Sequence, residues 1–148
     1  MTIWLDDLTP GRRFTAGPVE VTEDAIRRFA AEYDPQPFHL DAAAAEAHPI
    51  FQGLAASGWQ TAALTMKLVV QAMGELGWGV IGTQGDLQWP RPTRPGDLLT
   101  LVSEVLEVTP SKSRPDRGMV LFRNATLNQR GEEVQVFTVR VLVPRKME

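Results

Sequence analysis

The fold of this chain is decided by the stretch LAASGWQTAALTMKLVVQAM, residues 54–73. Its larger apolar residues recur at the 3.6-residue spacing of a helix, and most of the residues between them are small or apolar as well. This pattern predicts a helix roughly 30 Å long, enough to cross a small domain, with an apolar surface on nearly every side. We therefore expect other elements to enclose the helix, and Gly74 and Gly77 to end it.

Four runs with strand character follow the helix, over residues 80–89, 98–108, 119–128 and 133–143. Valines occupy both alternating faces of the last run, which predicts a strand in the interior of a sheet. A turn is expected between the last two runs, where Gly131 can adopt the positive φ that a hairpin requires. Because the helical patterns precede the strands, the chain is expected to be α+β rather than an alternation of strand and helix.

The first half of the chain contains a short strand and two further helices. The strand is expected over residues 14–21, and the first helix runs from Thr22, a favourable N-cap, to Tyr33. The second helix is shorter; Asp41 can cap it, and Pro49 cannot continue it. The segment between these two helices is expected to be a loop.

That segment, YDPQPFHLD at residues 33–41, places an acid and an imidazole on backbone braced by prolines. Pro35 and Pro37 fix their own φ and push the residues before them out of the helical region, so a stiff, non-helical loop is predicted. A stiff loop can hold a general acid or base where proton transfer needs it. Asp34 and His39 are therefore candidate catalytic residues. The alternatives are an Asx turn at Asp34 and a structural histidine bonded to a backbone carbonyl.

Around this segment the sequence resembles the signature of the MaoC-like hydratases and dehydratases, roughly Gly-Asp-x-Asn-Pro-Leu-His followed by a small-residue helix and a glycine. Tyr33 stands in place of the first glycine and Gln36 in place of the asparagine, although the Gln36 amide can still hydrogen-bond within the loop. The segments LQWP at 87–90 and RPGD at 94–97 are also similar to the family, so the resemblance covers most of the chain. The residues that match the signature are Asp34, Gln36, Pro37, Phe38, His39, the alanines at 42–45 and Gly53.

The resemblance implies one hotdog domain over residues 1–148, in which an antiparallel sheet wraps a long central helix. It also implies an enoyl-CoA hydratase or 3-hydroxyacyl-CoA dehydratase, which adds water reversibly to a 2-enoyl-CoA thioester. Asp34 and His39 would hold the water, and the N–H of Gly53 would bind the thioester oxygen at the start of the long helix. The alternative for Gly53 is a simple turn before that helix.

Other residues are expected to complete this site. Gln36, Ser57 and Thr61 would support the catalytic pair through hydrogen bonds, although a helical hydroxyl can instead bond its own backbone. Basic residues in the loop 109–118 would either meet the phosphates of coenzyme A or form a solvated charged loop. The expected substrate-binding residues are Phe38, Trp59, Trp89, Arg91 and Arg94.

Two other functions remain open beside the hydratase. A hotdog acyl-CoA thioesterase usually takes a water-activating carboxylate from its long helix, and residues 52–73 contain no Asp or Glu. A non-catalytic module that binds acyl ligands would explain why Tyr33 and Gln36 depart from the signature. The hydratase is favoured over both, because the acid and the imidazole match the signature.

Composition narrows the remaining classes. The chain has no cysteine, which removes disulfides and thiolate chemistry and fits a reducing, cytoplasmic location. With two histidines, no metal site is expected, and no cofactor beyond the coenzyme A of the substrate. A net charge of −3 disfavours nucleic-acid binding, and the acidic N-terminus and short apolar runs disfavour a signal peptide and membrane insertion. Because a sheet of this size leaves an edge to be covered, a homodimer or dimer of dimers is expected.

Overall fold

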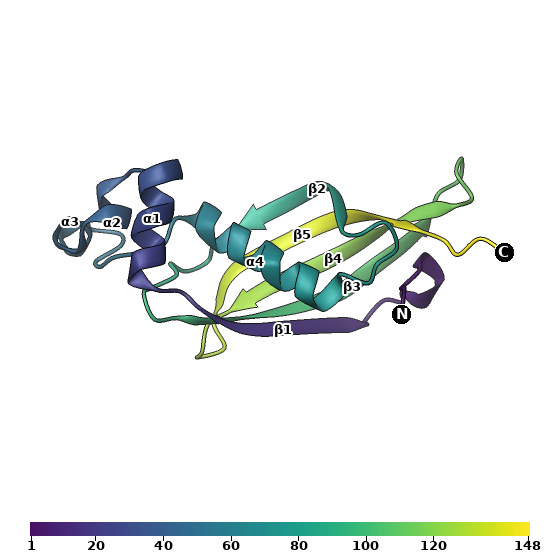
Figure 1. Cartoon of the computed structure of the whole chain (residues 1–148), viewed down its shortest axis with the longest axis horizontal. Helices are drawn as coiled ribbons and strands as arrows, with labels where there is room; N and C mark the ends of the chain where they lie inside the picture. The colour runs from purple at the N-terminus through teal and green to yellow at the C-terminus, as the bar shows by residue number, and fades with distance from the viewer.

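A five-stranded antiparallel sheet with one long helix across its face forms the body of the molecule, as the computed structural model of residues 1–148 shows (Figure 1). The strands are β1 (Arg13–Glu20), β2 (Ile81–Gln88), β3 (Leu98–Pro110), β4 (Arg117–Leu127) and β5 (Glu133–Pro144), in the spatial order β1-β3-β4-β5-β2. The helices are η1 (Leu5–Asp7), α1 (Glu23–Tyr33), α2 (Pro37–Leu40), α3 (Ala42–Ala47) and α4 (Gly58–Met73). This arrangement confirms the predicted α+β hotdog fold.

The strands predicted from the sequence are all present. β5 lies between β4 and β2, which confirms the interior position predicted from its valines. The turn between β4 and β5 contains Gly131 at φ 75°, a conformation that glycine adopts without strain. β1 pairs with β3 through a register shift between Ala16 and Val19, so the Gly-Pro pair interrupts the ladder without ending the strand.

The segment between α1 and α3 departs from the prediction. Residues Pro37–Leu40 form the helix α2, whereas the two prolines predict a loop without helix. Proline disfavours helix for the residue before it, and Gln36 is extended, with φ −94° and ψ 143°. Pro37 itself stands at the first helical position, where its missing N–H costs no hydrogen bond. The caps of the flanking helices are as predicted, because the side chains of Thr22 and Asp41 accept hydrogen bonds from the first turns.

The long helix α4 begins at Gly58 rather than near residue 54, and is therefore about 24 Å long instead of roughly 30 Å. The Ser57 hydroxyl caps it by accepting a hydrogen bond from the N–H of Trp59 at 3.3 Å. The residues just before this cap are buried but not helical. Apolar spacing alone misplaces the start, because a serine side chain can satisfy first-turn N–H groups and so begin the helix later.

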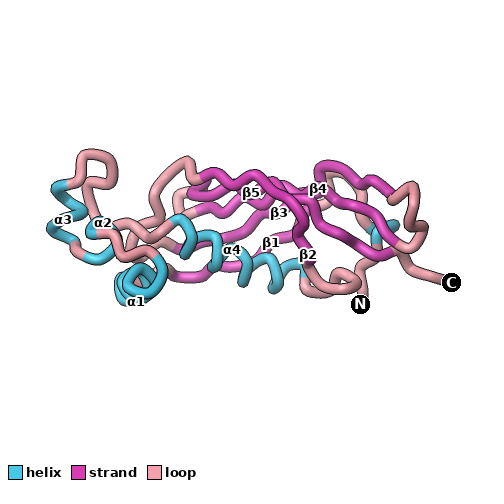
Figure 2. The backbone as a smooth tube through the Cα atoms, turned by 90° about the horizontal axis from the view of Figure 1, so that it is seen from above, coloured by secondary structure: helices cyan, strands magenta, loops and turns pink.

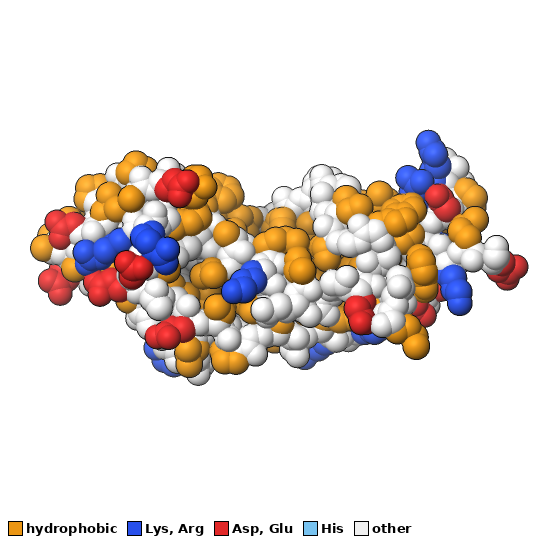
Figure 3. All heavy atoms as spheres, in the orientation of Figure 1, with side chains coloured by type: hydrophobic (Ala, Val, Ile, Leu, Met, Phe, Trp, Pro, Cys, Tyr) orange, Lys and Arg blue, Asp and Glu red, His pale blue; other side chains and the backbone are white.

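One side of α4 packs on the sheet, and the other side is open. On the open side, Trp59, Met66 and Val70 expose 60%, 44% and 52% of their surface. Apolar atoms are visible over the middle of this face of the molecule in Figure 3. The prediction of an enclosed helix is therefore wrong for one chain by itself. The buried residues of the helix are Gln60, Thr61, Thr65, Leu68, Val69 and Met73.

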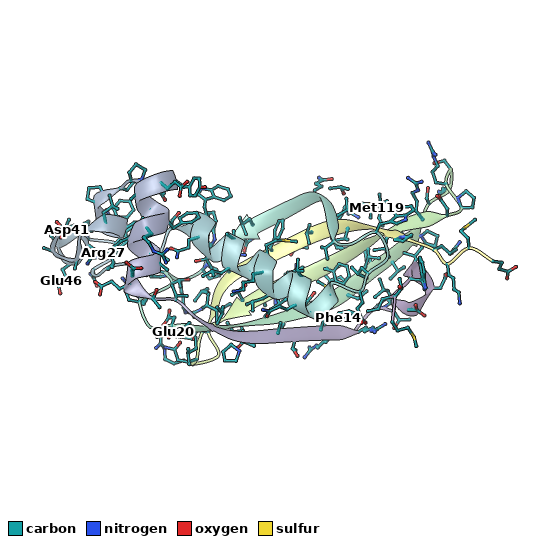
Figure 4. All side chains as sticks on the ribbon, in the orientation of Figure 1. Phe14, Glu20, Arg27, Asp41, Glu46 and Met119 are labelled. Carbon is teal, nitrogen blue, oxygen red and sulfur yellow. The ribbon has the colours of Figure 1, made fainter.

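The helices α1, α2 and α3 gather at one end of the sheet, and both chain termini lie toward the opposite end (Figures 1 and 2). In Figure 4, Asp41 and Glu46 mark the helical end, and Met119 on β4 marks the other. The core between sheet and helices is a cluster of 20 buried hydrophobic residues. No helix combines the length and the apolar character needed to cross a membrane. The acid and imidazole of the 33–41 segment therefore lie at the helical end.

Candidate active site

Asp34 and His39 meet at the helical end of the molecule. Asp34 ends α1 and His39 lies on α2, so the turn between these helices brings the two side chains together. The His39 Nε2 atom lies 3.3 Å from the Asp34 Oδ2 atom, and His39 is only 4% exposed. An extended chain could hold the same residues as far as about 16 Å apart. The helical turn α2 is what makes the contact possible.

The ring of His39 has a defined orientation. Its Nδ1 atom lies 2.6 Å from the carbonyl oxygen of Ala55. Because a carbonyl only accepts hydrogen bonds, Nδ1 must carry a hydrogen, and Nε2 is the nitrogen that gains or loses a proton. The carbonyl bond expected of a structural histidine is thus present, and it turns the other nitrogen toward Asp34.

Asp34 is held in its ionised form. Burial raises the pKa of Asp34, but hydrogen bonds from the Gln36 amide and the Ser57 hydroxyl, together with the charge of His39, outweigh burial and bring the pKa below the ordinary value of 3.8. The Gln36 Nε2 atom lies 2.6 Å from the Asp34 Oδ1 atom. The two supporting residues on either side of Asp34 therefore favour a carboxylate at neutral pH.

Replacing Gln36 with leucine is expected to raise the pKa of Asp34. The Gln36 amide stabilises the charged carboxylate and so lowers its pKa. Without the amide, the effect of burial, which raises the pKa, is less fully offset. A ¹³C NMR titration of the Asp34 carboxyl carbon would measure the change. The control Gln36→Asn keeps an amide and should lie closer to the wild type. A Gln36→Leu titration at or below the wild-type pKa would contradict this account of Asp34.

A cavity of ≈ 490 Å³ opens beside the pair, between α2, the start of α4 and the segment that follows β2. Phe38 stacks on Phe51 on one side, with ring centroids 4.6 Å apart. Trp59 and Trp89 meet edge to face on the other side, at 5.3 Å. The outline of the molecule is hollowed between the helical end and the sheet in Figure 3. Both predicted catalytic side chains thus line one cavity with aromatic walls.

Gly53 does not have the position expected of it. Its N–H donates to the carbonyl of Ala45 at 3.0 Å, so it has no free hydrogen for a substrate oxygen. Gly53 also lies before the helix and outside the residues that line the cavity. Gly58 does line the cavity, at the first position of α4, and its N–H has no partner within the protein. First-turn N–H groups point out of a helix and favour a negative charge.

Two other expected residues have structural partners instead. Thr61 does not reach Asp34, because its hydroxyl donates to the Thr93 hydroxyl at 3.0 Å. Arg94 lies outside the cavity lining, and its guanidinium donates to the carbonyls of Phe51, Gly53 and Leu54. Arg94 therefore holds the chain that leads into α4 and is not free to bind phosphate.

Of the other basic candidates, only Arg91 lines the cavity. It also pairs with Glu132 at 3.5 Å. Lys112, Arg114 and Arg117 lie at or beside the turn between β3 and β4, at the end of the sheet away from α2 (Figure 1). Within one chain, residues 109–118 therefore do not line the cavity.

Sequence reasoning missed several residues of the site. Gly58 was missed, although the sequence indicates it. A serine such as Ser57 can cap a helix, and a glycine directly after it leaves room for a ligand at the helix start. The carbonyl of Ala55, the Phe51 ring and the Thr93 hydroxyl have no local signal. They reach the site only through long-range folding.

Comparison with known proteins identifies relatives of this chain. The family model for the MaoC like domain matches residues 7–120. A MaoC-like dehydratase from Rhodospirillum rubrum, known from its crystal structure, is 51% identical with a TM-score of 0.94, and the match covers 99% of each chain.

Two further relatives are more distant. The (R)-hydratase PhaJ1 from Pseudomonas aeruginosa, solved in the unliganded form, is 27% identical with a TM-score of 0.76, over 98% of this chain and 88% of that one. YdeM, an uncharacterized protein of Bacillus subtilis (strain 168), is 36% identical over 145 residues, which cover 95% of this chain and 99% of YdeM.

Proposed function

Because this chain belongs to the MaoC-like dehydratase family, we propose that it catalyses the reversible addition of water to a 2-enoyl-CoA, giving a 3-hydroxyacyl-CoA. The observation that carries the proposal is the Asp34–His39 pair, 3.3 Å apart, in a cavity that also contains the first N–H of α4. This arrangement combines a group that accepts a proton, a group that donates one, and a donor for a developing oxyanion.

Activation of the substrate begins at the thioester carbonyl. Conjugation makes C3 of the enoyl group electrophilic, and a hydrogen bond from the Gly58 N–H to the carbonyl oxygen increases that character. The same N–H stabilises the enolate oxygen as charge moves onto it, and the positive end of α4 adds to the effect. Gly58 replaces Gly53 in the oxyanion role, since only its N–H is free.

The proton transfers follow from the ionised state of Asp34. Asp34 accepts a proton from water while the water oxygen bonds to C3. The electron pair of the C2–C3 double bond moves to C2, which takes a proton from Nε2 of a protonated His39. The proton on Asp34 then passes to His39 across their 3.3 Å contact, and the site returns to its starting state. Dehydration is the same sequence in reverse.

The substrate carrier is proposed to be coenzyme A, with Arg91 at the mouth of the cavity as the basic residue placed to meet a phosphate. The chemistry needs no redox cofactor, because water addition to a conjugated thioester changes no net oxidation state. A panel of 2-enoyl-CoA thioesters tests the function: a hydratase removes the conjugated absorbance without releasing thiol. Free thiol would identify a thioesterase, and binding without either change would identify an acyl-ligand binding module.

We also propose that two copies pair through α4 and β2. β2 is an edge strand that pairs only with β5, and nearly all of its residues are exposed. An open strand edge is a template for pairing, and the exposed apolar side of α4 offers surface to bury. A twofold dimer would cover both at once.

Light scattering is expected to give twice the 16.4 kDa chain mass, or a higher even multiple. Val70→Glu, on the open side of α4, should shift the protein toward monomer, because a buried unpaired charge is costly. Leu98→Glu also replaces an exposed apolar residue, but on β3 away from α4, and should leave the mass unchanged. A wild-type monomer, or a Val70→Glu protein of unchanged mass, would contradict this interface.

A further inference from the structure

The cavity has a buried floor and an open mouth. Ala56, Thr61 and Thr93 line it and are buried, whereas Ile50 and Arg91 line it and are exposed. A coenzyme A moiety is large and charged and must leave through the mouth. The acyl group of a bound thioester is therefore directed toward the floor, and the floor decides how long that group can be.

Trp89 forms one wall beside this floor, and its ring is fixed from several directions. Its Nε1 donates to the Oε1 of Gln135 at 3.0 Å, and its ring meets Trp59 edge to face. The ring also lies against the backbone of Gly58, because a Cβ built at Gly58 would stand 2.6 Å from it. Although 41% of the Trp89 surface is exposed, these contacts hold the ring in place along the side of the cavity.

Gln135 is the residue that holds Trp89. It lies on β5 and is only 1% exposed, which is unusual for a glutamine. A buried amide oxygen without a donor is costly, and the Trp89 indole supplies the donor here. Gln135 acts on the cavity through Trp89 and is therefore a positioning residue rather than a catalytic one.

The space between α4 and the sheet contains buried polar pairs among its apolar residues. Buried hydroxyl and amide groups bond one another there: Thr61 with Thr93 at 3.0 Å, Thr65 with Thr126 at 2.6 Å, and Ser103 with Asn124 at 2.6 Å. An alkyl chain that entered would separate these pairs and leave buried polar groups unsatisfied. That loss opposes the gain from burying the chain.

From these observations we infer that Trp89, held by Gln135, is a fixed side wall of the acyl part of the cavity, and that the protein selects short-chain acyl thioesters. The inference deepens the proposed function and rests on it for the identity of the thioester. The Thr61–Thr93 pair forms the floor behind C3, and the two tryptophans bound it laterally.

Two measurements test the inference. The first is kcat/KM for 2-butenoyl-CoA against 2-octenoyl-CoA, and the second is the affinity for the unreactive butanoyl-CoA against octanoyl-CoA. Wild-type protein should favour the four-carbon ligand in both. Trp89→Ala should shift the preference toward the eight-carbon ligand by at least about tenfold, since burial of each further methylene strengthens binding roughly fourfold. The double variant Trp89→Ala with Gln135→Leu should shift it further, because the opened space is then apolar.

Gln135→Leu alone frees the ring without adding space, and should relax the length preference more than it lowers turnover of 2-butenoyl-CoA. Trp78→Ala is the matched control, because Trp78 is a half-exposed tryptophan stacked under Arg117 and outside this cavity; it should leave the preference unchanged. Trp89→Phe, which keeps a ring but removes the donor, serves if the alanine variant fails to fold.

An eight-carbon preference in the wild type, or an unchanged preference in Trp89→Ala or Trp89→Phe, would overturn the inference. Absence of turnover with every enoyl-CoA would overturn the proposed function instead. The affinities for the saturated thioesters would still decide whether Trp89 limits chain length.

Discussion

Replacing Asp34 with asparagine, or His39 with alanine, is expected to lower kcat/KM for a 2-enoyl-CoA by about 10²-fold or more. Asparagine cannot take a proton from water, and alanine removes the donor to C2. The loss should appear in kcat rather than in KM, because both groups act on the transition state. Steady-state kinetics with 2-butenoyl-CoA would measure it.

The double variant separates a working pair from two independent residues. Since Asp34 and His39 act on one water, the double variant should be little worse than the poorer single variant. Circular dichroism should check the fold of each variant, because Asp34→Asn changes no volume whereas His39→Ala removes a buried ring. Wild-type turnover in either single variant would remove the pair from the mechanism, and fully additive losses would mean that they do not share a water.

Gly58→Ala is expected to lower kcat/KM by about 10²-fold, the scale of a misplaced oxyanion donor. The added methyl group would stand 2.6 Å from the Trp89 ring, so either the ring or the start of α4 must shift. Either shift moves the Gly58 N–H away from the thioester oxygen or closes the approach to it. Kinetics on folded protein of unchanged mass would measure the loss.

Gly53→Ala is the matched comparison, because it places the same methyl group at the glycine of the sequence signature. Gly53 has φ 156°, where an L side chain is strained, and its Cβ would lie 3.3 Å from the Arg94 Nη1 atom, so Gly53→Ala is expected to lose stability. Its N–H is already bonded to Ala45. For the folded protein, we expect a much smaller loss of kcat/KM than for Gly58→Ala. The reverse result, with Gly53→Ala inactive and Gly58→Ala active, would return the oxyanion role to Gly53.

The segment around α2 shows which features the local sequence predicts and which it does not. Residues 34–39 predict an acid and an imidazole in one braced segment, and both do line the cavity. The same prolines predict a loop, and that prediction is wrong because Pro37 begins a helix. A proline restricts the residue before it and its own φ, and those restrictions fit a first helical turn as well as a loop. Local rules left both conformations open, and packing against the neighbouring helices selected one.

By itself the sequence determined most elements of this protein and the residue types of the proposed catalytic pair. Periodicity, caps and turn residues act over a few positions, so they placed the strands and the starts of α1 and α3, and they put Asp34 and His39 in one short segment. The tertiary structure alone decided which backbone groups stayed free. Ala45 takes the N–H of Gly53, Arg94 takes the carbonyls before α4, and Gln135 takes the indole of Trp89. The Arg94 and Gln135 bonds join residues 40 or more positions apart, and the Gly53 bond closes the loop that follows α3. Buried polar groups must find partners wherever folding brings them, and no local pattern records which partner that is.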